Sequence, residues 1–219
     1  MQQEPLLMPF QDQPFNGDTY ICEKFLELKQ RYDIRTVIET GTCFGVTTKW
    51  LAENFEFVFT VEINEEFANF ARKRLVGMGN VISIVHDSVL MLKHVNNLIN
   101  PERQQTRFIF FLDAHWGEHC PLLDEIEAIS RIGLKQAPVI AIHDFYTGDP
   151  QLGFDTYNGQ PFTYDFIKPA VEEVEKVYGI QYVAEYNTIE QSAGAKRGII
   201  YLHPLEPKPS IEDAEIIND

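Results

Sequence analysis

The sequence predicts an α/β fold: a three-layer α/β/α sandwich around a mostly parallel seven-stranded sheet with a C-terminal antiparallel hairpin strand. Short apolar runs alternate with helix-length segments over most of the chain, which is typical of a parallel sheet with helices on both faces. Two β-rich runs without a helix between them then follow, which indicates a terminal hairpin. The length of 219 residues is sufficient for one domain of this kind.

The expected strands are short apolar runs bounded by polar or turn residues. They cover residues 36–39, 57–61, 81–85, 108–112 and 139–142. The helices that alternate with them are expected at 46–54, 65–76, 88–99, 122–132 and 164–178. The hairpin is expected from runs 180–185 and 198–202, which flank a small and polar stretch.

Three parts of the chain are distinguished. Residues 1–33 are predicted to form an N-terminal arm and helix, in which a Gln- and Pro-rich segment stays irregular through Asn16 and Asp18 or Thr19 caps the helix. Residues 34–203 form the predicted Rossmann-like domain, and residues 204–219 form an acidic tail. Within the domain, the loop over 145–162 is long and aromatic, which favours a folded lid or acceptor-binding loop over disorder.

The net charge of the chain limits the classes of partner that it is expected to bind. The formal net charge of −15 is unfavourable for proteins that bind by neutralising phosphates, so we expect neither nucleic acid nor an anionic membrane as partner. No run approaches the length of a membrane helix, and Cys22, Cys43 and Cys120 form no disulfide or zinc pattern. A cytoplasmic location is therefore expected, while formation of a homo-oligomer stays open.

The most informative segment joins the strand at 36–39 to the next helix through a glycine-bearing turn. Glycines let the backbone approach a ligand closely, and the helix start offers free N–H groups to an anion. About twenty residues later, Glu62 follows the strand at 57–61, where a nucleotide-binding βαβ unit meets a ribose diol. The two features together indicate a nucleotide-type cofactor.

At these residues the chain resembles class I S-adenosylmethionine-dependent methyltransferases, and the resemblance spans about residues 34–203. Glu39-x-Gly41-x-x-x-Gly45 is similar to their first motif and lacks the second glycine of the dehydrogenase pattern G-x-G-x-x-G at Cys43. The resemblance implies that Gly41 and its neighbours, including Thr42, line the methionine moiety of the cofactor. Glu39 would then hold its ammonium group, and Glu62 would hold the ribose hydroxyls.

The ends of the later strands extend the resemblance. Asp87 follows the third strand, where the family commonly places an acid that accepts from the adenine amino group, although Asp87 or Ser88 could equally be a helix cap. The next strand ends in Asp113, Ala114 and His115, and the fifth ends in His143 and Asp144. The resemblance also implies that Gly45, Ser88 and Asp113 lie at the cofactor. The carboxyl ends of such strands hold the chemistry of open α/β sheets.

Two interpretations of these strand ends remain open. Asp113, Asp144 and His143 could bind a divalent metal such as Mg²⁺, or His115 or His143 could act as general base without a metal, with Asp113 beside it. The resemblance is nearest to small-molecule O-methyltransferases of the macrocin and catechol type, which carry a metal-binding acid after the fourth strand. The pair His143-Asp144 departs from their pattern after the fifth, so a softer metal or none also fits.

The sequence therefore predicts an enzyme that transfers a methyl group from S-adenosylmethionine to a small molecule, on a hydroxyl oxygen. Two alternatives are kept: an NAD-type oxidoreductase and a protein that binds S-adenosylmethionine without catalysis. The missing glycine argues against the first, and the cluster of titratable residues at the strand ends argues against the second.

Overall fold

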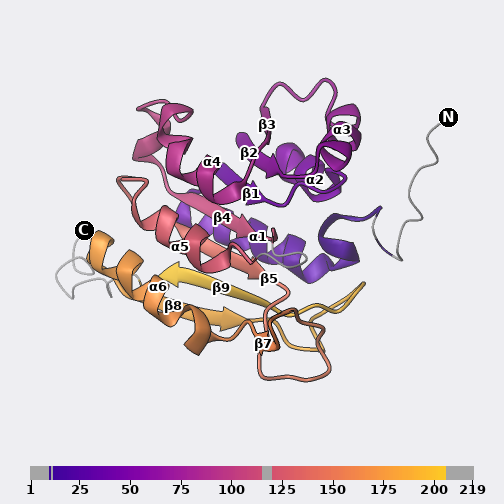
Figure 1. Ribbon diagram of the computed structural model, residues 1–219, viewed down its shortest axis with the longest axis vertical. Coiled ribbons are helices and arrows are strands. Elements are labelled where there is room, and N and C mark those ends of the chain that lie inside the picture. Colours follow the sequence, from indigo (N-terminus) through magenta and orange to yellow (C-terminus); the bar gives the residue numbers. More distant parts are fainter. Residues whose placement is uncertain (1–9, 11, 115–119, 206–219) are drawn as a thin grey trace, which may run out of the picture.

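The computed structural model describes residues 10, 12–114 and 120–205. It confirms the predicted fold: a mixed, mostly parallel sheet of seven strands in the order β3-β2-β1-β4-β5-β9-β8 (Figure 1). The strands are β1 (Thr36–Thr40), β2 (Phe57–Glu62), β3 (Val81–Val85), β4 (Phe108–Leu112), β5 (Val139–His143), β8 (Tyr182–Tyr186) and β9 (Ile199–Pro204). Strand β9 runs antiparallel to both of its neighbours, β5 and β8, as the hairpin prediction requires.

Six α-helices are present in the described part of the chain. They are α1 (Thr19–Tyr32), α2 (Val46–Asn54), α3 (Glu65–Arg74), α4 (Ser88–His94), α5 (Leu122–Ser130) and α6 (Tyr164–Tyr178). The predicted helix 88–99 is shorter than expected, because a 3₁₀ turn, η2 (Val95–Asn97), replaces its end. Asn96 and Asn97 are poor helix formers, which accounts for this early end.

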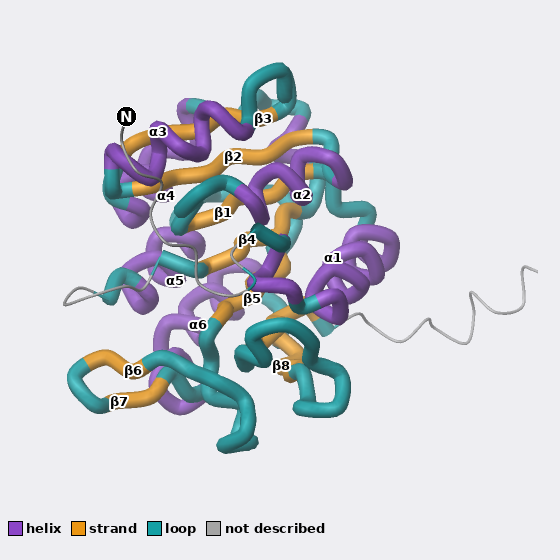
Figure 2. Tube along the Cα trace, turned by 90° about the vertical axis from the view of Figure 1, so that its right-hand side faces the viewer, coloured by secondary structure: helices purple, strands orange, loops and turns teal. Residues whose placement is uncertain are grey.

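Two hydrophobic layers sandwich the sheet. Because side chains alternate along a strand, Ile38, Phe59 and Phe110 face α4, α5 and α6, whereas Val37 and Val58 face α1 and α2. Figure 2 shows α1 and α2 on one side of the sheet and α4, α5 and α6 on the other. Strands β1 to β5 pair with one another in parallel, so their carboxyl ends lie at the same edge of the sheet.

The described part of the segment before α1 packs onto the domain. Residues Pro14–Gly17 form a short turn, η1, with left-handed backbone at Phe15 (φ +50°) and Asn16 (φ +53°), and Phe15 is 2% exposed. Its ring packs against those of Phe25, Trp50 and Phe111, with ring centroids 4.9, 5.3 and 5.3 Å away. This burial, rather than a local pattern, fixes the segment to the domain.

The long loop after β5 is folded in the structure. It contains a small antiparallel hairpin of β6 (Thr156–Tyr157) and β7 (Gln160–Pro161), which extends from the body of the molecule in Figure 2. The N–H of Tyr146 donates to the carbonyl oxygen of Phe162 at 2.8 Å and closes the loop at its base. Within the described residues, no helix combines the length and the apolar character needed to cross a membrane.

Candidate active site

A cavity of about 500 Å³ opens at the carboxyl ends of the parallel strands. Its walls come from the turn after β1, the ends of β2, β3 and β4, and the segment before α1. The last of these contributes Gln13, Phe15 and Asn16, which the sequence alone did not associate with a site. Clefts of this volume at this edge of an open α/β sheet are where such folds bind their ligands.

The glycine turn forms the floor of this cavity. Gly41 has a φ of +84°, and a Cβ atom there would lie 2.4 Å from the carbonyl oxygen of Asp113, so no other residue fits between the ends of β1 and β4. Gly45 has a φ of +71° and precedes α2, where a Cβ would approach Ala71 to 3.0 Å. The hydroxyl of Thr42 bonds that of Thr60 at 2.5 Å and holds the turn against β2.

Glu39 lies beneath the turn and is 1% exposed. Its Oε2 accepts hydrogen bonds from the hydroxyls of Thr48, at 2.5 Å, and Thr60, at 2.6 Å. Burial raises the pKa of Glu39 to about 8, against the opposite effect of these two hydrogen bonds. A cationic group brought into the cavity would favour the charged form of this carboxyl.

Glu62 ends β2 and is oriented by two backbone groups. Its Oε2 accepts from the N–H of Cys43 at 2.7 Å, and its Oε1 accepts from the N–H of Asn64 at 2.8 Å. Each carboxylate oxygen can accept more than one hydrogen bond, so Glu62 keeps acceptor capacity for a ligand diol. The bond to Cys43 also ties the glycine turn to the end of β2.

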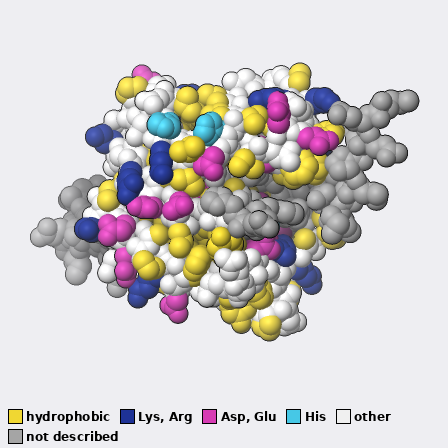
Figure 3. Space-filling model, viewed as in Figure 1, with side chains coloured by type: hydrophobic (Ala, Val, Ile, Leu, Met, Phe, Trp, Pro, Cys, Tyr) yellow, Lys and Arg dark blue, Asp and Glu magenta, His cyan; other side chains and the backbone are white. Residues whose placement is uncertain are grey.

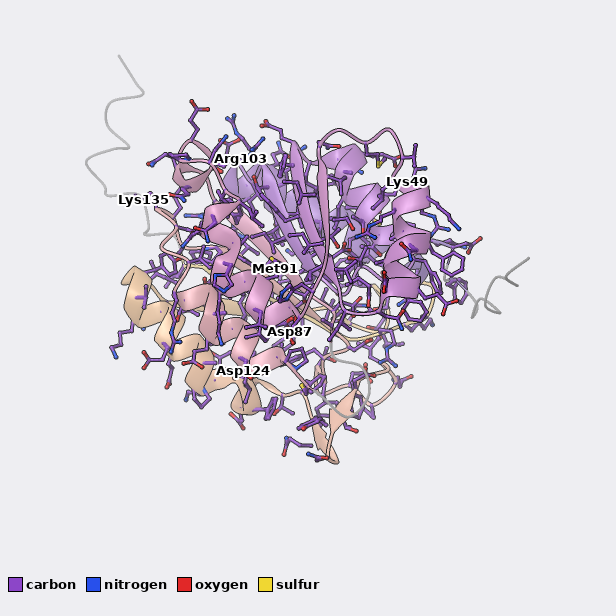
Figure 4. The ribbon with its side chains drawn as sticks, turned by 45° about the horizontal axis from the view of Figure 1, so that its top comes forward. Lys49, Asp87, Met91, Arg103, Asp124 and Lys135 are labelled. Atoms are coloured by element: carbon purple, nitrogen blue, oxygen red, sulfur yellow. The ribbon has the colours of Figure 1, made fainter. Side chains whose placement is uncertain are left out.

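Asp87 follows β3 and caps α4, because its side chain accepts from the N–H of Leu90 at 2.9 Å. It also lines the cavity together with Ser88, so the capping and binding interpretations of this position are compatible. Figure 4 shows Asp87 at the start of α4, while Arg103 and Lys135 lie near the other end of the sheet.

Glu125 on α5 is a carboxyl that the sequence did not single out. It is 0% exposed, and neither of its oxygens has a hydrogen-bond partner of good geometry among the described residues. Burial raises its pKa to about 7, although the nearby hydroxyls of Ser88 and Thr40 favour the charged form. A carboxyl on an amphipathic helix gives no sequence signal of this kind, because Glu is an ordinary residue on exposed helix faces.

Asp113, His143 and Asp144 come together at the ends of β4 and β5. Nδ1 of His143 lies 3.2 Å from Oδ1 of Asp113 and 3.3 Å from Oδ1 of Asp144. Burial alone would lower the pKa of His143, but the carboxylates of Asp144 and Asp113 outweigh it and hold the pKa well above its usual range. His143 is 1% exposed and does not line the cavity, whereas Asp113 does.

Arg197 completes this network from the segment between β8 and β9. Its Nε donates to Asp144 and its terminal nitrogen donates to Asp155, in the loop after β5. Burial opposes the shift, but His143 and Arg197 hold the pKa of Asp144 below its usual range. Nothing local in the sequence linked Arg197 to these acids, since the residues are 53 and 42 positions apart.

The predicted metal ligands can be tested against this geometry. One ligand atom each from Asp113, His143 and Asp144 lie within 4.8 Å of one another. A metal-binding imidazole must be neutral, however, whereas His143 points Nδ1 at two carboxylates that favour its protonated form. Asp144 is also bonded to Arg197. His143 and Arg197 therefore already pair with these acids, and a divalent metal bound here would have to displace those contacts.

The structure thus brings most predicted site residues together. The cavity is lined by Glu39, Gly41, Thr42, Glu62, Asp87, Ser88 and Asp113. Gly45 caps α2 beside it, and His143 and Asp144 lie behind Asp113. His115, predicted as a general base, lies outside the described residues.

Comparison with curated proteins gives partial matches. The chain is 31% identical to the ribosomal RNA small subunit methyltransferase A of Streptococcus pneumoniae over 93 residues, 41% of this chain and 32% of the relative. It is 30% identical to the protein of that name from Syntrophus aciditrophicus over 78 residues, 36% and 28% of the two chains. The matched regions therefore span about a third of the length of these relatives. No family model matches the chain.

Solved structures match over most of the chain. The O-methyltransferase TomG from Streptomyces achromogenes, in complex with S-adenosylmethionine, is 20% identical with a TM-score of 0.52, covering 84% of this chain and 79% of that one. An O-methyltransferase from Bacillus cereus with S-adenosylhomocysteine is 20% identical with a TM-score of 0.51, covering 85% and 81%. An rRNA methylase from Streptococcus thermophilus is 19% identical with a TM-score of 0.50, covering 84% and 96%.

The fold is therefore that of the class I S-adenosylmethionine-dependent methyltransferases. Within this fold, the similar structures include both O-methyltransferases and rRNA methylases. The kind of methyl acceptor must consequently be argued from the site of this chain itself.

Proposed function

We propose that the protein is an S-adenosylmethionine-dependent methyltransferase that methylates a hydroxyl oxygen of a small molecule in the cytoplasm. The single observation that carries the proposal is the cavity, in which the glycine turn after β1 converges with acids from the carboxyl-terminal parts of β1 and β2 and from the turns after β3 and β4. A protein that only bound a nucleotide would not need the buried acid and imidazole network behind Asp113.

In this proposal the cofactor lies along the strand ends. Gly41 and Thr42 receive its methionine part, and the carboxyl of Glu39 lies below for the ammonium group. Glu62 accepts hydrogen bonds from the ribose hydroxyls with the acceptor capacity that its two backbone bonds leave. Asp87 accepts from the adenine amino group while it continues to cap α4.

The reaction forms a bond between the acceptor oxygen and the methyl carbon and breaks the bond between that carbon and the sulfonium sulfur. A neutral thioether leaves, so alignment of the reactants is the main task, worth up to about 7–11 kcal/mol in well-oriented systems. The hydroxyl proton passes to a base. We assign this base to Asp113, which is the one acid of the Asp113–His143–Asp144 network that lines the cavity. His143 lies behind Asp113 and pairs with it. His115 stays a second candidate for the base.

Charge favours a small molecule over RNA as the acceptor. The net charge is −15, and the described lining of the cavity contains four carboxylates but no Lys or Arg. In Figure 3, Lys and Arg side chains are scattered among acidic ones on the face shown. Binding to a phosphate backbone requires clustered cations, so the partial match to rRNA methyltransferases does not by itself favour RNA here.

Calorimetry with S-adenosylmethionine, S-adenosylhomocysteine and NAD, with and without Mg²⁺, tests the cofactor. We expect the first two to bind with similar affinity in either condition. Binding of NAD alone would favour an oxidoreductase, and a strict requirement for Mg²⁺ would restore the metal interpretation. Radiolabelled methyl transfer to a panel of small hydroxyl compounds and to ribosomal RNA then tests the acceptor; labelled RNA would refute the small-molecule proposal.

Substitutions at the acid and imidazole pair test the mechanism. Asp113→Asn and His143→Ala should each lower turnover, by about 10²–10⁴-fold if the pair serves proton transfer, and His143→Ala should leave cofactor affinity little changed. Glu127→Gln, at a half-exposed residue on α5, is the matched control. Full turnover in both site variants would remove the pair from the mechanism and leave His115 as the base.

A further inference from the structure

A second group of buried polar atoms lies outside the cavity, on the α1 side of the sheet. Among the described residues, Oδ2 of Asp18, Nε2 of His143 and the hydroxyl of Tyr201 are buried without a hydrogen-bond partner. They come from the N-cap of α1, the end of β5 and the middle of β9. Folded proteins rarely leave buried polar atoms unsatisfied, so three of them in one region require an explanation.

The register of the sheet brings two of these residues together. In the antiparallel pair of β5 and β9, His143 is opposite Ile199 and Ala141 is opposite Tyr201. His143 and Tyr201 are therefore diagonal neighbours on one face, at a separation that aromatic side chains can span. Ring centroids of Tyr201 and Phe25 are 6.4 Å apart. Tyr201 thus packs against α1, and His143 lies on the same face of the sheet.

Asp18 is the N-cap residue of α1. Its Oδ1 caps the helix by accepting from the N–H groups of Tyr20 at 3.0 Å and Ile21 at 3.4 Å, which leaves Oδ2. The charge of Asp18 acts electrostatically on both His143 and Tyr201. Besides burial, Tyr20 and Cys22 of α1 and Glu185 of β8 also raise the pKa of Tyr201. The backbone N–H of Ala193 favours the charged form of Asp18.

We infer that Asp18, His143 and Tyr201 together bind one buried water molecule. The carboxylate of Asp18 accepts, whereas Nε2 of His143 and the Tyr201 hydroxyl can each donate or accept. Three partners are the usual number for a buried water. A small neutral molecule that both donates and accepts hydrogen bonds therefore fits the three atoms best.

This water connects the start of α1 to the candidate active site. His143 is bonded at Nδ1 to Asp113 and Asp144 and would be bonded at Nε2 to the water, which fixes the plane of the ring from both sides. Asp18 is then a positioning residue that acts on Asp113 through the water and His143. The site itself does not depend on the proposed methyl transfer, so its tests are independent of that activity.

A crystal structure of the full chain at high resolution tests the site directly. We expect one ordered water within about 2.7–3.2 Å of Oδ2 of Asp18, Nε2 of His143 and the hydroxyl of Tyr201. An empty position would overturn the inference. A direct hydrogen bond between Asp18 and His143, with no room for a water, would overturn it as well.

The substitution Tyr201→Phe gives a test whose sign is decisive. If the hydroxyl bonds a water, its removal costs a hydrogen bond and lowers the melting temperature by about 2–4 °C. If the hydroxyl is unsatisfied, its removal leaves the melting temperature unchanged or raises it, which would contradict the inference. Tyr182→Phe is the reference, because the hydroxyl of Tyr182 donates to the carbonyl oxygen of Pro138 at 2.7 Å.

The substitution Asp18→Asn tests the positioning role without removing the helix cap, because Asn caps helices as well as Asp does. We expect the ¹⁵N resonance of Nε2 of His143 to shift, since the charge facing it through the water is lost. Asp33→Asn, at the exposed C-cap of the same helix, should leave this resonance in place. An unchanged resonance in Asp18→Asn would show that Asp18 does not act on His143.

Discussion

The buried carboxyl of Glu125 is expected to make the free energy of unfolding depend on pH. Its carboxyl is fully buried, and burial raises its pKa from the ordinary value of 4.5 to about 7. The folded state therefore holds the proton more tightly than the unfolded state. The stability from this group is fully present below pH 4.5 and is lost as the pH rises through about 7.

The size of this effect follows from the two pKa values. The difference between 4.5 and about 7 corresponds to about 3 kcal/mol of unfolding free energy, reached above pH 7. Glu125→Gln replaces the carboxyl by a neutral group of similar shape and removes this dependence. We expect the variant to match the wild type near pH 4.5 and to exceed it by up to about 3 kcal/mol at pH 8.

Urea unfolding of both proteins at several pH values between 4.5 and 8 measures this difference. Contributions from other titrating groups, including Glu39 and His143, cancel when the variant is subtracted from the wild type. Glu127→Gln on the same helix, at a half-exposed side chain, should give a flat difference over this range. A flat difference for Glu125→Gln as well would refute the reasoning from burial.

Three further substitutions test the cavity and its loop. Gly41→Ala should abolish S-adenosylmethionine binding and lower the melting temperature, because a Cβ would lie 2.4 Å from the carbonyl oxygen of Asp113; unchanged affinity by calorimetry would contradict the assigned floor. Glu62→Gln should weaken cofactor binding by about 10–100-fold, with Glu65→Gln on exposed α3 as control, since hydrogen bonds to a charged acceptor are the strong ones. Arg197→Lys should increase hydrogen exchange in residues 145–162 and raise the KM for the acceptor, because Lys cannot bridge the carboxylates of Asp144 and Asp155 as a planar guanidinium does. Equal exchange in both proteins would show that the bridge does not hold this loop.

The strands and the glycine turn could be predicted because their signals are local. A buried strand and a tight turn are both predicted within a few residues, by Val37, Ile38 and Glu39 and by the Gly41 that follows. The structure places β1 at the centre of the sheet and brings Gly41 against β4. Here hydrophobic burial and local backbone requirements point to the same conformation, which is the condition under which sequence patterns predict structure.

Phe15 and Arg197 could not be predicted in this way, because their roles depend on residues far along the chain. Phe15 is buried by Phe111, almost a hundred positions later, and the surrounding Gln- and Pro-rich segment has the composition of an exposed arm. Arg197 lies in a small and polar stretch whose partners follow β5. Both contacts exist only once the sheet has brought the segments together.

His143 is the position where the sequence did contain a usable signal. Alternation along β5 assigns Val139, Ala141 and His143 to one face and Ile140 and Ile142 to the other. Val139 and Ala141 belong to the layer under α1, so the same alternation assigns the imidazole to that side rather than to the cavity. Asp144 then turns back with a φ of +56°, which lets its carboxylate meet Nδ1 of His143. His143, predicted as a general base, thus lies behind Asp113, and its role in proton transfer stays a prediction.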